Sequence, residues 1–106
     1  MLAQKEIILL LQDGHTNKMV SMSCTTQDNL FTTITRYCRF AEWDKVSVRI
    51  GRAEIDVLNS YNTQDQDSAK NLLQQVLGVF FATAPPIVCT VTVVTKDGPA
   101  VPLSRL

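Results

Sequence analysis

The chain begins with a continuous apolar run that predicts a fully covered strand. Residues 7–11 read Ile-Ile-Leu-Leu-Leu within a predicted strand at 5–12, and Asp13-Gly14 follows. The run is short and ends at turn residues, so a strand is favoured over a helix. Because no polar residue interrupts it, we expect both faces of this strand to be covered.

The next segment alternates in polarity and predicts a second strand at 19–24. One face of this strand carries Val20, Met22 and Cys24, and the other carries Met19, Ser21 and Ser23. This period of two is typical of a half-exposed strand. We expect it to pair with the first strand as a hairpin through residues 13–18.

A helical repeat at about 27–42 follows the first hairpin. Thr25 and Thr26 supply N-cap hydroxyl groups, and Asp28 lies in the first turn, where the helix dipole favours a carboxylate. Apolar residues recur at helical spacing at Leu30, Ile34, Cys38 and Ala41. The pattern therefore predicts an amphipathic helix.

Two further strands, at 46–50 and 53–58, flank the dipeptide Gly51-Arg52. A two-residue loop favours a hairpin in this position. It would pair Ile50 with Ala53, Val48 with Ile55, and Val46 with Val57. All six side chains would then face one side of the sheet.

The last two predicted elements are a long helix and a strand. Thr63 and Gln66 form a capping-box pattern, and Ala84-Pro85-Pro86 ends the helix. Its apolar positions at helical spacing are Ala69, Leu72, Leu73, Val76, Leu77 and Phe80. Residues 87–95 then alternate apolar side chains with threonine, which predicts a strand.

The element order ββαββαβ predicts one α+β domain over residues 1–106. We expect a two-layer sandwich in which an antiparallel or mixed sheet of about five strands has two helices packed on one face. Residues 97–106 form a docked or frayed tail in this interpretation. The order also resembles the β-grasp arrangement of the ubiquitin-like kind over Met19 to Arg36 and Val46 to Asn62, with the long second helix as a departure. The resemblance implies a β-grasp-like fold as the alternative.

Charge and hydropathy exclude several classes of partner. The 106 residues include ten basic and ten acidic side chains, so the formal net charge is zero and no long-range field attracts nucleic acid. We therefore expect no nucleic-acid partner. The apolar runs are shorter than the ~20 residues that span a bilayer, so we expect no membrane association.

The three cysteines indicate a reducing compartment. Cys24, Cys38 and Cys89 are odd in number and widely spaced within apolar segments, which is typical of buried thiols and not of a disulfide framework. This predicts a cytoplasmic protein. No Cys-x-x-Cys or His-x-x-x-His spacing is present, so we expect no metal and no cofactor.

One aromatic and basic cluster follows the first predicted helix and is a candidate interface. Its members are Arg36, Tyr37, Arg39, Phe40 and Trp43. Trp, Tyr and Arg dominate the energetics of protein interfaces. The alternative interpretation is that the aromatic residues close the core and the cations complement the helix end.

The functional hypothesis from sequence is a non-catalytic interaction module that self-associates, as a homo-oligomer such as a dimer, through the sheet face away from the helices. The apolar first strand and the final Thr/Val strand motivate it, because that face needs cover. The same face could instead bind a different protein.

Two alternatives remain open. A small-molecule pocket between helix and sheet would be lined by Met22, Phe31, Phe80, Phe81 and Cys89. An enzyme without a recognisable motif would require His15, Cys38, Arg52 and Asp56 to share a cleft. No catalytic residue is assigned from the sequence.

Overall fold

The computed structural model describes residues 5–37, 43–58, 66–83 and 87–96. The elements are β1 (Glu6–Asp13), β2 (Met19–Cys24), α1 (Gln27–Tyr37), β3 (Trp43–Ile50), β4 (Ala53–Leu58), α2 (Gln66–Ala82) and β5 (Val88–Thr95). The order ββαββαβ confirms the prediction. None of the described helices has the length and apolar character needed to cross a membrane.

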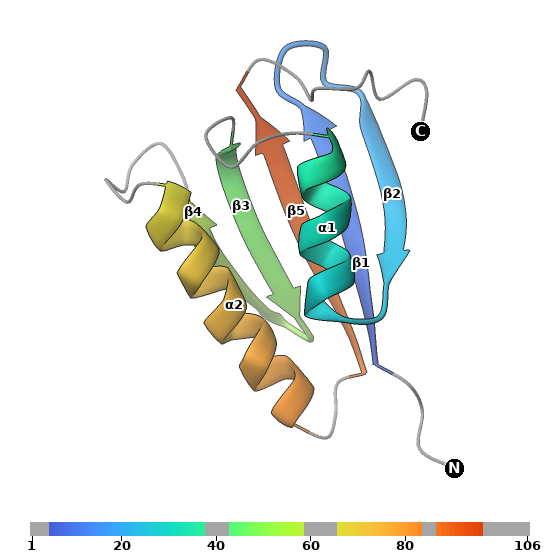
Figure 1. Cartoon of the computed structure of the whole chain (residues 1–106), viewed down its shortest axis with the longest axis vertical. Coiled ribbons are helices and arrows are strands. Elements are labelled where there is room, and N and C mark those ends of the chain that lie inside the picture. The colour runs from blue at the N-terminus through green and yellow to red at the C-terminus, as the bar shows by residue number, and fades with distance from the viewer. Residues whose placement is uncertain (1–4, 38–42, 59–65, 84–86, 97–106) are drawn as a thin grey trace.

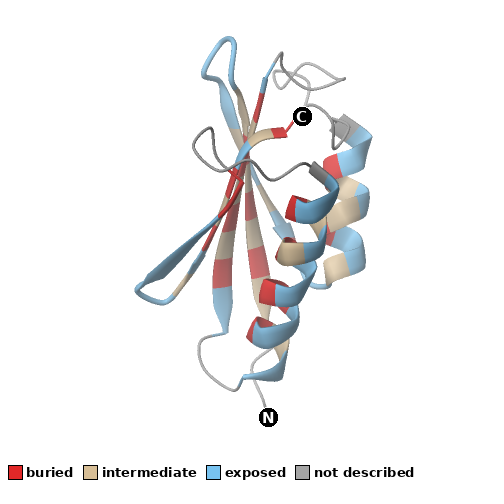
Figure 2. Ribbon diagram, turned by 90° about the vertical axis from the view of Figure 1, so that its left-hand side faces the viewer, coloured by how far each residue is buried: buried red, intermediate tan, exposed pale blue. Residues whose placement is uncertain are grey.

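The five strands form one mixed sheet in the order β2-β1-β5-β3-β4. β1 and β5 run parallel, whereas the other neighbouring pairs are antiparallel. Both helices pack on the same face (Figures 1 and 2), which confirms the two-layer α+β sandwich. The element order through β4 agrees with the β-grasp-like alternative, and the 17-residue α2 departs from it.

The core lies between the sheet and the two helices. Buried side chains on the sheet come mainly from alternate positions of the central strands: Ile7, Leu9, Leu11, Val46, Val48, Cys89, Val91 and Val93. The helices bury Leu30, Ile34, Ala69, Leu73, Val76, Leu77 and Phe80 against them, as predicted, while Leu72 is half-buried. The periodicities of the helices and the central strands therefore identified the covered surfaces, whereas Ala53 and Ile55 on β4 are exposed.

The β1–β2 hairpin forms in the predicted place, and its turn is held by Asp13. The Asp13 N–H donates to the Lys18 carbonyl at 2.9 Å. The Asp13 carboxylate accepts hydrogen bonds from the N–H groups of His15 and Thr16. Burial opposes ionisation of this carboxylate, but the hydrogen bonds outweigh it and the pKa of Asp13 is lowered.

Gly14 joins this turn to the end of β5. Its N–H donates to the Thr95 carbonyl oxygen at 3.0 Å. A Cβ atom at this position would lie 2.0 Å from the same oxygen. Only glycine therefore fits here without moving the backbone.

The β3–β4 hairpin corrects part of the predicted register. Ile50 pairs with Ala53 and Val48 with Ile55, as predicted, but Val46 pairs with Leu58 and not with Val57. The prediction for Val46 was wrong because the register shifts between Val46 and Ser47. A β-bulge of this kind places one extra residue on one strand and is invisible to simple alternation.

The ends of several elements also differ from the expectation. β3 begins at Trp43 and not at Val46, and β5 begins at Val88. Thr26 caps α1, since its Oγ1 accepts the Asn29 N–H at 3.0 Å. The predicted continuation of α1 to residue 42, the Thr63 cap and the tail at 97–106 lie outside the described residues.

Candidate interaction surface

The sheet face away from the helices, here called the open face, is the main candidate site. The strand register arranges its side chains in three rows that cross the sheet. The first row is Ser23, Ile8, Thr90, Arg49 and Glu54; the middle row is Ser21, Leu10, Thr92, Ser47 and Asp56; the third row is Met19, Gln12, Val94 and Lys45. Each strand contributes every second residue, because side chains alternate between faces.

The open face has an apolar and hydroxyl half and a charged half. On β1 and β5 the side chains of Ile8, Leu10 and Val94 are half-buried although neither helix covers them. Among the described residues, the expectation that both faces of the first strand are covered is therefore met in full on the helix side only. β3 and β4 supply the charges of both signs.

The charged half is hollowed. Figure 2 shows the tip of the β3–β4 hairpin lying on the side away from the helices. Two hollows of about 370 and 320 Å³ adjoin there and share Ser47, Glu54 and Thr92 in their walls. The β-bulge between Val46 and Ser47 explains why the β3–β4 hairpin bends away from the helices, because a bulge increases the local twist of a strand.

Four charged side chains lie at exposed positions of this face. The side chains are Lys45 and Arg49 on β3, and Glu54 and Asp56 on β4. Within residues 5–37, 43–58, 66–83 and 87–96 these four form no ion pair. The Glu54 and Asp56 carboxylates are exposed, as their alternation with Ile55 and Val57 indicated.

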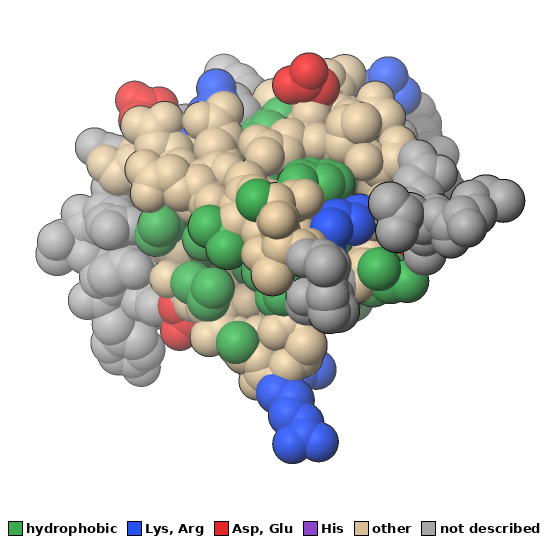
Figure 3. Space-filling model, turned by 90° about the horizontal axis from the view of Figure 1, so that it is seen from below, with side chains coloured by type: hydrophobic (Ala, Val, Ile, Leu, Met, Phe, Trp, Pro, Cys, Tyr) green, Lys and Arg blue, Asp and Glu red, His purple; other side chains and the backbone are tan. Residues whose placement is uncertain are grey.

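A second apolar surface lies at the end of the molecule where α2 stops and β5 starts. Hydrophobic side chains gather there in Figure 3, and Val79 and Ile87 are 65% and 45% exposed. Phe81 packs edge-on against Phe80, with ring centroids 5.1 Å apart. The Lys5 Nζ lies 4.5 Å from the Phe80 centroid, a cation–π contact.

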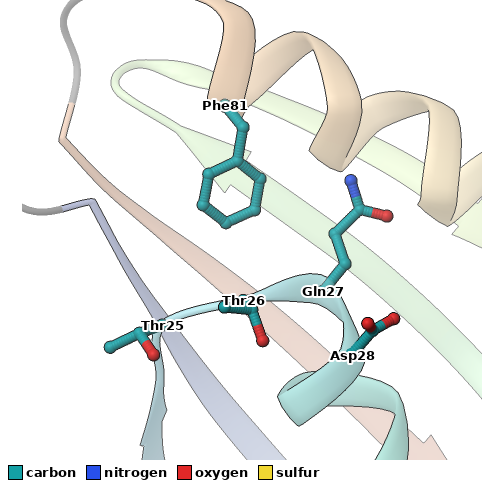
Figure 4. Close-up of a pocket in the computed structure, with 5 residues that line it drawn as sticks. All are labelled: Thr25, Thr26, Gln27, Asp28 and Phe81. Carbon is teal, nitrogen blue, oxygen red and sulfur yellow. The ribbon is translucent and has the colours of Figure 1, made fainter.

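A hollow of about 460 Å³ adjoins this end at the start of α1 (Figure 4). It is lined by Thr25, Thr26, Gln27, Asp28 and Phe81. The Thr26 hydroxyl oxygen is occupied as the helix cap. The hollow therefore offers one aromatic ring and a polar rim.

The residues predicted to bind a small molecule lie at different depths. Phe80 and Cys89 belong to the fully packed core, whereas Met22, Phe31 and Phe81 are half-buried at its margin. Phe81 lines the hollow at the start of α1. The predicted pocket between helix and sheet is therefore filled by core side chains at Phe80 and Cys89.

The predicted aromatic and basic interface is divided by the fold. Trp43 is fully buried in the core. Arg36 is exposed in the last turn of α1. The Tyr37 side chain, Arg39 and Phe40 lie outside the described residues.

The structure describes three of the four residues named in the catalytic hypothesis. His15 lies in the β1–β2 turn and Arg52 in the β3–β4 turn, at opposite ends of the sheet in Figure 1. Asp56 lies on β4, and Cys38 is outside the described residues. Among the residues that the structure describes, no cluster of three or more metal-ligating groups forms.

The two described thiols have raised pKa values. Burial raises the pKa of Cys24, opposed by a hydrogen bond with Thr33. Burial also raises the pKa of Cys89 to about 11, opposed by the positive charge of Lys5. Both thiols are unpaired and protonated at neutral pH, so neither is an activated nucleophile.

Sequence reasoning did not assign Leu10, Ser47 or Thr92 to the site. Alternation along each strand predicts which residues share a face, but the rows across the sheet require the strand order. No protein-family model, curated protein or solved structure matches the chain.

Proposed function

We propose that this chain is a small non-catalytic interaction module that forms a homodimer through the open face. The observation that supports it most directly is that Ile8, Leu10 and Val94 are only half-buried on a face that no described helix covers. Apolar side chains at positions that no described helix covers favour a protein contact. The zero net charge of the chain leaves no overall repulsion between two copies.

A two-fold axis parallel to β5 gives the best match of the face to itself. β5 then lies over the partner's β5, and β1 and β2 lie over the partner's β3 and β4. Ser21 and Ser23 meet the partner's Asp56 and Glu54, so hydroxyl groups donate to carboxylates. No pair of like charges is brought into register, which favours this axis over one that crosses the strands and would set Arg49 against Lys45.

The area of the open face gives an expectation for the affinity of the dimer. Strands about 4.8 Å apart, each presenting about seven residues at about 3.3 Å, give roughly 500–600 Å² per chain. The total of about 1,100 Å² buried in a dimer is just above the roughly 1,000 Å² expected of a biological interface. We therefore expect a dimer with micromolar affinity.

The decisive variant is Thr92→Lys, because Thr92 lies in the middle row on β5 and faces the partner's Thr92. Two lysines near the axis repel and raise the dissociation constant by at least about tenfold. The matched control is Thr32→Lys, since Thr32 is exposed on α1. Light scattering coupled to size-exclusion chromatography measures the mass of each variant across a concentration series.

A cross-linking measurement tests the position of the contact. Stacked sheets lie about 10 Å apart, which a short bismaleimide spans. Thr92→Cys should give covalent dimers above the wild-type level, and Thr32→Cys should not. A wild-type chain that stays monomeric at tens of micromolar, or equal masses for Thr92→Lys and Thr32→Lys, would overturn the proposal.

We also propose that the protein resides in the cytoplasm. Cys24 and Cys89 are unpaired and buried, which suits a reducing compartment. A second candidate function is small-molecule binding at the hollow that Phe81 lines. A panel of metabolites that leaves the melting temperature unchanged would contradict it.

A further inference from the structure

The two halves of the open face differ in relief as well as in charge. On the middle row, Leu10 of β1 is followed across the sheet by Thr92 of β5 and then by Ser47 of β3. The hollow of about 370 Å³ is lined by all three residues, and Ser47 also lines the adjoining hollow of about 320 Å³. A large apolar side chain therefore lies on one side of β5, and a small side chain shared by two hollows lies on the other.

A two-fold axis parallel to β5 places these unlike positions against each other. Leu10 is one strand from β5 on one side, and Ser47 is one strand from β5 on the other, at the same level of the sheet. The axis exchanges the two sides, so Leu10 of each chain lies over the partner's Ser47. A two-fold interface makes each such contact twice. Large side chains then lie opposite small ones, as shape complementarity between two packed surfaces requires.

An axis that crosses the strands leaves this relief unmatched. It sets Leu10 against the partner's Leu10 and Ser47 against the partner's Ser47. The hollows then face each other, and the side chains that line them lose packing contacts. The relief of the face therefore favours the same axis as the charges do, from a separate observation.

We infer that Leu10 of each chain inserts into the partner's hollow at Ser47 and is the side chain by which the protein recognises a second copy of itself. This inference rests on the proposed dimer and adds the contact that gives it affinity and selectivity. The register selects a second copy as the occupant, because its Leu10 and Thr92 fall opposite Ser47 and Thr92 at the same spacing along one row. Leu10 is only half-buried in the single chain, so its insertion removes further apolar area from water.

Charged side chains border the hollows and form the rim of this contact. They are exposed and comprise Lys45, Arg49, Glu54 and Asp56. The methylene groups of lysine and arginine can cover apolar surface while the charged ends stay in water. An apolar side chain can therefore enter without burying a charge, and an apolar centre within a polar rim is typical of an interface hot spot.

The test uses one variant that fills the hollow and one that shortens the inserted side chain. Ser47→Leu blocks the hollow and keeps Leu10, whereas Leu10→Ala leaves the hollow open. We expect each variant alone to have a dissociation constant at least about tenfold above that of the wild type, because both contacts of its homodimer are lost. The matched control Thr32→Leu adds the same side chain at an exposed position of α1 and should leave the dissociation constant unchanged.

Mixing the two variants should restore the dimer. Leu10 of the Ser47→Leu chain enters the open hollow of the Leu10→Ala chain, and the shortened side chain lies over the filled hollow. We expect the mixed dimer to have a dissociation constant at least about tenfold below that of either variant alone. Native mass spectrometry distinguishes mixed from unmixed dimers by mass, and recovery of the dimer shows that both variants fold.

The outcomes separate this inference from the proposed dimer. A wild-type chain that stays monomeric at tens of micromolar overturns both. If Thr92→Lys disrupts a wild-type dimer but Ser47→Leu dimerises as tightly as Thr32→Leu, the open face is the interface and the inference about Leu10 is wrong. Mixed dimers that form in no more than the statistical proportion would also overturn the inference alone.

Discussion

Leu9 and Leu10 are neighbours in β1, yet Leu9 is fully buried beneath the helices and Leu10 is half-buried on the open face. The same contrast separates Val91 and Val93 from Thr92 in β5. Strand geometry sends adjacent side chains to opposite faces, and only one face receives helices. Apolar side chains of β1 therefore lie on both faces: Ile7, Leu9 and Leu11 build the core, whereas Ile8 and Leu10 lie on the face that neither helix covers.

The largest effect should come from truncating this pair of leucines. Leu9→Ala removes a core side chain and leaves a cavity, so we expect the free energy of unfolding to fall by about 2–5 kcal/mol. Leu10→Ala should cost less, about 1–2 kcal/mol in a dilute monomer, because this side chain is already partly exposed and no helix packs on it. Urea denaturation at submicromolar concentration measures both, and equal losses would break the contrast between the faces.

The next effect concerns Cys89 on the covered face. Its pKa is about 11 in the folded chain against a usual value of 9.0, so the folded state keeps the proton that the unfolded state releases. The contribution of this thiol to the free energy of unfolding is fully present below pH 9. It falls by on the order of 2 kcal/mol as the pH rises from 9 to about 11. In Cys89→Ala the decline in unfolding free energy over this range should be shallower, and parallel declines would contradict the assignment.

The smallest effect compares two threonines. Thr26→Ala deletes the cap of α1 in the layer that covers the sheet, and we expect a loss of about 1 kcal/mol. Thr92→Ala on the open face should change the stability of the monomer by less than about 0.5 kcal/mol. Chemical denaturation of both variants sharpens the comparison, since a larger loss for Thr92 would show that the open face stabilises the single chain.

Local patterns predicted most of the covered face. The repeat in α2 identified Leu73, Leu77 and Phe80, and alternation in β5 identified Cys89, Val91 and Val93 as buried. The side chain of Trp43 was assigned to an interface, but the structure places it in the core. Trp43 is the first residue of β3, and the register shift between Trp43 and Lys45 interrupts the alternation that would have assigned it to the core face.

The candidate surface depended on tertiary structure to a greater degree. Alternation placed Glu54 and Asp56 on an exposed face, yet the rows that bring Leu10 beside Thr92 and Ser47 depend on β5 lying between β1 and β3. The sequence allowed both a mixed sheet and an antiparallel meander. The two sheets bury the same residues, so burial alone could not choose between them.

By itself the sequence determined the type and order of the elements and most of the residues that they turn toward the core, because these follow from periods of 2 and 3.6 within short segments. Only the tertiary structure decided the strand order, the bulge that moves Val46 onto Leu58, and the contact of Gly14 with Thr95. These features arise between residues far apart in the chain. Their energies depend on which segments pack together, and no local pattern contains that information.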